Sequence, residues 1–186
     1  LRYAPRDLFI VFSIKFFEST AYFGFSYVYA PFLSEEFGFT DVEAGYIYAG
    51  YGLLCSVFGL LAGPVVDGLD YRSALLLGTI PSFLGRFLSA VTLDARLAVI
   101  CSVTFLPLGA AFGLPVFALG VRRFTHAENR AFAFTVFYAV LCASCAAGGA
   151  VISYARGRFH DGVELPWPLD ESGSRQLSWV RVNVLL

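Results

Sequence analysis

Five apolar segments constrain this chain more than any other feature of its sequence. They cover residues 8–33, 44–66, 73–93, 97–121 and 131–154, and the connections between them are short and polar. Each segment is close to or longer than the roughly 20 residues with which an α-helix crosses the hydrocarbon core of a bilayer. The pattern therefore predicts an all-α fold, a multi-pass transmembrane helix bundle over residues 1–154.

The composition argues against a water-soluble protein. Hydrophobic residues make up 58% of the 186 residues, charged residues make up 15%, and the mean hydropathy is +0.69. A soluble domain carries about 25% charged residues, and a soluble chain of this length could not bury so much apolar surface. The net charge of −1 and the absence of basic runs in the sequence argue against a nucleic-acid partner. The partner that this composition requires is the lipid bilayer.

The distribution of arginines predicts the orientation. One side of the predicted bundle would carry Arg2, Arg6, Arg72, Arg122, Arg123 and Arg130, whereas the connections on the other side carry only Arg96. Because positive charges gather on the cytoplasmic side, the amino terminus is predicted to be cytoplasmic, although Arg156 and Arg158 oppose this bias. Residues 155–186 then form a polar non-cytoplasmic loop, which leads at residues 178–186 to the start of a truncated sixth helix.

Ionisable side chains inside the apolar segments are the candidates for function. Lys15, Glu18 and Tyr22 share one face of the first predicted helix, and Arg86 lies in the third. An ionisable group inside a bilayer usually faces a cavity or a charged partner. We therefore predict that these four residues line a pathway for a solute or a proton, with Glu18 exchanging the proton. Arg86 could bind an anionic group of the solute or pair with Glu18. The alternatives are an internal Lys15–Glu18 ion pair that only offsets its own burial and an Arg86 side chain that reaches for the membrane interface.

The connection between the second and third segments has a distinctive charge pattern. Gly63 permits a close approach of helices, Asp67 ends one predicted helix, and Arg72 begins the next. Such a cluster can hold one end of a bundle in one conformation and release it in another. The alternative interpretation is a solvated turn. Small residues four apart, Gly59 with Gly63 and Gly109 with Gly113, further predict two close helix crossings.

No catalytic or metal-binding pattern is apparent. Cys142 and Cys145 form a C-x-x-C spacing, but they lie inside an apolar segment, where small packing residues are expected. His126 and His160 are far apart in sequence, without the partners of a catalytic set. The sequence therefore predicts neither an enzyme nor a metal or cofactor site.

The loop at Gly63, Asp67 and Arg72 resembles the signature between the second and third helices of the major facilitator superfamily. The segment from Lys15 to Gly24 is similar, at Glu18, Tyr22 and Gly24, to a motif of proton-coupled oligopeptide transporters within that superfamily. Residues 16–63 and 113–138 also resemble uncharacterised superfamily members from single-celled eukaryotes.

This resemblance implies a secondary transporter with two bundles of about six helices each, between which a small solute binds near the membrane midplane. The chain would then be the amino-terminal half, which lacks its carboxy-terminal half and is inactive alone. It would be either a truncated product or the translation of an incomplete gene model. The resemblance also makes a proton a candidate coupling ion. The alternative is a bundle that does not transport, such as a membrane subunit or a receptor-like protein.

Overall fold

Helices make up nearly all of the chain that the structure describes. The computed structural model describes residues 6–159, 163–164 and 176–185. Its elements are α1 (Arg6–Phe37), α2 (Asp41–Asp67), α3 (Tyr71–Val91), α4 (Ala95–Arg123), the 3-10 helix η1 (Ala127–Asn129), α5 (Arg130–Arg158), β1 (Val163–Glu164), β2 (Gln176–Leu177) and α6 (Trp179–Leu185). β1 and β2 pair antiparallel. The predicted all-α bundle is confirmed, and five helices within these described residues are long and apolar enough to cross a membrane.

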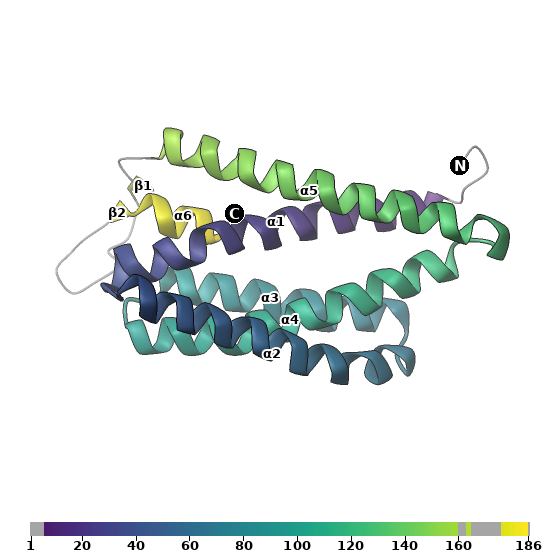
Figure 1. The fold of residues 1–186 in the computed structure, drawn as a ribbon, viewed down its shortest axis with the longest axis horizontal. Coiled ribbons are helices and arrows are strands. Elements are labelled where there is room, and N and C mark those ends of the chain that lie inside the picture. Colours follow the sequence, from purple (N-terminus) through teal and green to yellow (C-terminus); the bar gives the residue numbers. More distant parts are fainter. Residues whose placement is uncertain (1–5, 160–162, 165–175, 186) are drawn as a thin grey trace.

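The long helices form two groups. Figure 1 shows α1 and α5 side by side, with α2, α3 and α4 as a second group beneath them. Within the second group, α4 packs against both α3 and α2. The short α6 contacts α1, α3 and α5 at the end of the bundle away from the amino terminus. This arrangement leaves α1 facing α3 and α4 across the middle of the bundle.

The turn between α1 and α2 follows from its sequence. Gly38 has a φ of 71°, a left-handed conformation that glycine adopts without steric penalty. Thr40 then caps α2, because its hydroxyl accepts a hydrogen bond from the Glu43 amide while the Glu43 carboxylate accepts one from the Thr40 amide at 2.9 Å. This capping box satisfies amide groups that would otherwise lack partners at the start of the helix.

The helix ends differ by one to four residues from the predicted segments, and the ends of α3 and α5 show why. α3 ends at Val91 because Thr92 is extended, so the third helix stops short of residue 93. α5 continues to Arg158, so residues 155–158 are helical although they were predicted to open the polar loop. Arg156 and Arg158 lie in the last turn, where positive charge suits the carbonyl end of the helix. Within the predicted loop, Pro166, Trp167 and Pro168 lie outside the described residues.

The outward faces of the bundle are apolar. Leu60 on α2 is 81% exposed, Leu76 on α3 is 57% exposed, and many other large apolar side chains are exposed in the same way. In water such a surface would drive aggregation, whereas lipid tails solvate it. The helix lengths and this surface together define an integral membrane protein.

The closest helix crossing lies between α3 and α4. A Cβ atom added to Gly109 would lie 2.0 Å from the Ser82 hydroxyl oxygen and 2.7 Å from the Gly78 carbonyl oxygen, so only glycine fits there. The prediction of a close approach therefore holds at Gly109. It is wrong at Gly59 and Gly63, where an added Cβ would meet nothing within 4 Å in the part of the chain that the structure describes.

A buried arginine fastens α6 to the rest of the bundle. Arg181 is 5% exposed and forms an ion pair with Glu36 at the end of α1. It also donates hydrogen bonds to the carbonyl oxygens of Ala90 at 3.0 Å and Thr92 at 2.9 Å, where α3 ends. These carbonyl groups have no partner within their own helix, so Arg181 satisfies the end of α3 while it pairs with α1.

Candidate functional site

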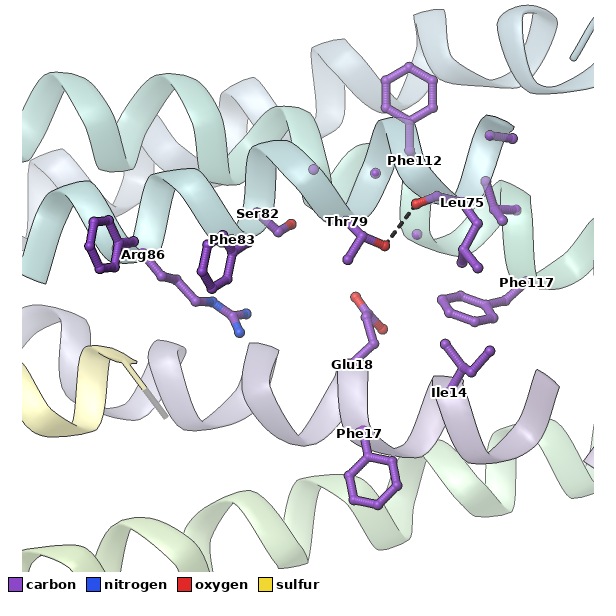
Figure 2. Close-up of a pocket in the computed structure, with 16 residues that line it drawn as sticks. Ile14, Phe17, Glu18, Leu75, Thr79, Ser82, Phe83, Arg86, Phe112 and Phe117 are labelled. Atoms are coloured by element: carbon purple, nitrogen blue, oxygen red, sulfur yellow. Dashed lines mark hydrogen bonds between the residues drawn. The ribbon is translucent and has the colours of Figure 1, made fainter. Parts of the chain in front are cut away.

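A cavity of about 450 Å3 lies between α1, α3 and α4. Figure 2 shows Glu18 and Arg86 pointing toward each other's helix across the cavity, with Thr79 opposite Glu18. Most of the other lining side chains are apolar, among them Leu75 and Phe117. The volume lies in the range of small-molecule sites in proteins, which are mostly apolar with a few placed polar groups. The cavity therefore has the size and the chemistry of a small-solute site.

Lys15 and Glu18 form an ion pair at one wall of this cavity. The Lys15 Nζ lies 2.8 Å from the Glu18 Oε2, and the Ser19 hydroxyl donates to the same oxygen at 3.2 Å. The two partners differ in burial, because the Lys15 side chain is 5% exposed and that of Glu18 is 35% exposed. The pair thus presents its carboxylate to the cavity and keeps its cation inside the bundle.

Two aromatic rings surround the buried ammonium group. The Lys15 Nζ lies 4.9 Å from the centre of the Phe117 ring on α4 and 5.9 Å from that of Phe137 on α5. The negative face of an aromatic ring attracts a cation, most strongly where water is excluded. Lys15 is therefore held between three helices as a fixed positive charge behind Glu18.

A glycine on α4 makes room for the Glu18 carboxylate. A Cβ added to Gly113 would lie 3.2 Å from the Glu18 Oε1. The hydrogen atom in that position lets the carboxylate rest against the α4 backbone. In the sequence Gly113 is predicted to bring two helices together, and the structure shows that it also accommodates a charged side chain.

Arg86 is the cation of the cavity without an internal partner. Its Nε is buried and makes no hydrogen bond, and the guanidinium makes no ion pair within the described part of the chain. Figure 2 shows the side chain extending toward α1 rather than along α3 to the bundle end. This geometry argues against an Arg86 side chain that merely reaches for the membrane interface. An arginine keeps its charge at every accessible pH, so this group needs an acceptor.

Tyr22 lies on the same helix as Glu18 but does not line the cavity. It packs instead against a cluster of buried residues that includes Phe25, Tyr29 and Tyr51 between α1 and α2. The structure thus places Glu18 and Arg86 at the cavity, with Lys15 paired to Glu18, and leaves Tyr22 outside the cavity lining.

The predicted latch residues lie at the opposite end of the bundle from α6. Asp67 is the last residue of α2 and Arg72 lies in the first turn of α3, and both are exposed. Neither forms an ion pair among the described residues. Arg72 instead lines a second cavity of about 610 Å3, together with Asp7, Asp70 and Arg123.

Several lining residues were not predicted from the sequence. Thr79, Ser82 and Phe83 on α3 face the cavity, and nothing in their local pattern distinguishes them from packing residues. Within the described residues, no group of three or more His, Cys, Asp and Glu side chains could hold a metal ion. The arrangement offers binding and proton exchange at charged groups inside an apolar bundle.

The fold and the cavity define a helical integral membrane protein with ionisable groups around an internal cavity. Comparison with known families gives a match to the Major Facilitator Superfamily over residues 11–160. Because the match covers most of the chain, the protein belongs to the Major Facilitator Superfamily. That superfamily consists of membrane transporters rather than enzymes. No curated protein matches the chain significantly.

Proposed function

We propose that this protein takes part in the secondary transport of a small solute by alternating access. The observation that carries the proposal is the cavity between α1, α3 and α4, where Glu18 and Arg86 face each other inside an apolar bundle. A structural bundle has no need of charged groups around a cavity, since each of them disfavours insertion into the membrane by about 2.5–3.5 kcal/mol. A solute pathway accounts for their presence.

Glu18 is the group that exchanges a proton in this proposal. Protonation would remove the charge that neutralises Lys15, whose side chain is only 5% exposed. An unpaired buried cation is unfavourable, so proton uptake at Glu18 has to be accompanied by a movement of Lys15 or by the entry of an anion. This coupling is the physical basis for proton-driven transport. The similarity of residues 15–24 to oligopeptide transporters remains a prediction from the sequence, since the family match is to the superfamily as a whole.

Alternating access in this proposal requires a second bundle. Rocking around a central site needs two bundles that move against each other, and the described part of this chain provides five spans, fewer than the roughly six of one bundle. We therefore expect that the 186-residue chain alone does not transport, and that its reading frame continues into about six or seven further spans.

The loop after α2 would serve as a latch against that second bundle, on the cytoplasmic side. The exposure of Asp67 and Arg72, and the absence of an ion pair for either among the described residues, support this role because both charges are free to contact a partner. Asp67→Asn should then weaken transport without changing the content of helix. Unchanged transport in that variant would indicate a solvated turn.

The proposal is tested by comparing cells that produce the whole reading frame with cells that produce residues 1–186 alone. Intracellular small solutes are compared by mass spectrometry after incubation in a complex medium. The whole product should change the level of at least one solute, and residues 1–186 should change none. Glu18→Gln should abolish the pH dependence of that change, whereas Glu35→Gln, on the same helix but exposed at its end, should preserve it.

A non-transporting bundle is the alternative. It would be favoured if the reading frame ended without further spans, if no solute changed, and if the chain co-purified with a stable membrane partner. The same measurements therefore decide between a transporter and a subunit or receptor-like protein.

A further inference from the structure

The charges around the cavity do not balance, and the imbalance identifies the kind of solute that fits. Glu18 is neutralised by Lys15 at 2.8 Å, whereas Arg86 makes no ion pair within the described residues. Glu18 and Arg86 are the ionisable residues among those that line the cavity. With Lys15 counted, the walls therefore carry one positive charge in excess.

Glu18 does not supply the missing partner of Arg86. No ion pair joins the two side chains within 4.0 Å, although Figure 2 shows them extending from α1 and α3 toward each other's helix. The Glu18 Oε2 is occupied by Lys15 and Ser19, and its Oε1 rests against Gly113. The carboxylate is thus fixed at its own position, and Arg86 is left to an acceptor from outside.

The remaining walls are apolar on both sides of the polar groups. Figure 2 shows Phe83 beside Arg86, and Ile14, Leu75 and Phe117 on the other side of Glu18. A small inorganic anion would leave these side chains in contact with water. An anion that carries an apolar body would cover Phe83 and would place its charged group at Arg86.

We propose that the cavity binds a small amphipathic monoanion, with its carboxylate on the Arg86 guanidinium and its apolar part against Phe83, which lies beside Arg86 in Figure 2. This inference rests on the proposed transport function, because it names the solute class for the same cavity. A carboxylate on a guanidinium forms two parallel charge-assisted hydrogen bonds, which a neutral amide cannot match.

The test is a binding comparison with the 186-residue chain purified in lipid nanodiscs. The probes are 3-phenylpropanoate, its neutral amide, propanoate, and L-phenylalanine, which adds an ammonium group to the same skeleton. Isothermal titration calorimetry measures each dissociation constant, and empty nanodiscs correct for partitioning into lipid. The unchanged chain should bind 3-phenylpropanoate about 10- to 100-fold more tightly than the amide, which is the preference expected from charge-assisted hydrogen bonds. It should also bind 3-phenylpropanoate at least about tenfold more tightly than propanoate, because the ring buries apolar area.

Two variants test whether the preference for the anion over the amide depends on Arg86. Arg86→Gln should abolish the preference for the anion over the amide, whereas Arg96→Gln, an exposed arginine in the first turn of α4, should preserve it. Circular dichroism reports whether each variant keeps its helices. Because the four probes are first compared on the unchanged chain, a variant that fails to fold does not remove the test.

Each outcome is decisive. Equal binding of 3-phenylpropanoate and its amide would overturn the anionic class, as would tighter binding of L-phenylalanine, which would indicate a zwitterion. Equal binding of propanoate would overturn the apolar part, and a preference that persists in Arg86→Gln would overturn the role of Arg86. Absence of binding by every probe would also overturn the inference. The transport proposal fails separately, if the cells that produce the whole reading frame change no solute even though the purified chain binds the anion.

Discussion

The unequal burial of Lys15 and Glu18 predicts unequal effects of removing one or the other. The Lys15 side chain is 5% exposed and that of Glu18 is 35% exposed. Glu18→Leu would leave the ammonium group as an unpaired charge inside the bundle, and breaking a buried ion pair in this way costs about 3–5 kcal/mol. Lys15→Met would leave a carboxylate that the cavity keeps partly hydrated and that Ser19 still binds at 3.2 Å, so we expect a loss of only about 1 kcal/mol.

The double variant tests this prediction further. Replacing a buried ion pair by apolar side chains of similar volume is often neutral or stabilising. The variant with both Lys15→Met and Glu18→Leu should therefore have an unfolding free energy within about 1 kcal/mol of that of the unchanged chain. Unfolding free energies are measured by titration with sodium dodecyl sulfate in mixed micelles, with helix content as the signal. The reasoning would be refuted if Lys15→Met were at least as destabilising as Glu18→Leu, or if the two losses simply added in the double variant.

The packing of the helices yields two further predictions. Gly109→Ala should separate α3 from α4 and destabilise the bundle by about 2 kcal/mol or more, since the new Cβ would overlap the Ser82 hydroxyl. Gly59→Ala is the control, because its new Cβ meets nothing within 4 Å among the described residues. It should be neutral or stabilising by up to about 1 kcal/mol in the same unfolding titration. Arg181→Gln should lower the unfolding free energy by about 3 kcal/mol and expose α6 to limited proteolysis, because it leaves the partly buried Glu36 carboxylate, 14% exposed, without its cation. Equal stability of the two glycine variants, or proteolysis of α6 at an unchanged rate, would contradict the respective packing.

Hydropathy predicted the helices because a segment that crosses lipid must make all its backbone hydrogen bonds within the segment, as an α-helix does. A long run of apolar residues therefore predicts a spanning helix. The exact ends were less predictable, since they depend on individual contacts. α5 continues through Arg156 and Arg158 because positive side chains favour the last turn of a helix, although both residues are polar and resemble a loop in a hydropathy profile.

The spacing of residues predicted which side chains share a face, but not what that face meets. Lys15 and Glu18 were expected together and do pair, whereas Tyr22 belongs to an aromatic cluster next to α2. The side chains that each residue of α1 contacts depend on which helix packs against α1 at that position along its length. The same limit applies to the glycines, since only the position of α3 distinguishes the crowded Gly109 from the open Gly59.

Arg181 carried no signal in the sequence. It lies in a short apolar stretch, and its acceptors are the end of α1 and the last carbonyl groups of α3, more than eighty residues earlier in the chain. A buried arginine of this kind is recognised only when the ends of three helices have been brought together. Local pattern therefore predicted the membrane-spanning elements and the cavity charges, while the connections among helices required the structure.

The existence of a water-accessible cavity inside a lipid-embedded bundle is tested most directly by cysteine labelling at two neighbouring positions. Thr79 lines the cavity, whereas Ile80 at nearly the same depth is 52% exposed and does not line it. In a background without the native cysteines, Thr79→Cys in membrane vesicles should react with a charged methanethiosulfonate reagent, and Ile80→Cys should not, because a thiol in lipid does not ionise. Rapid labelling of Ile80→Cys, or protection of Thr79→Cys, would contradict a bundle that faces lipid outside and water within.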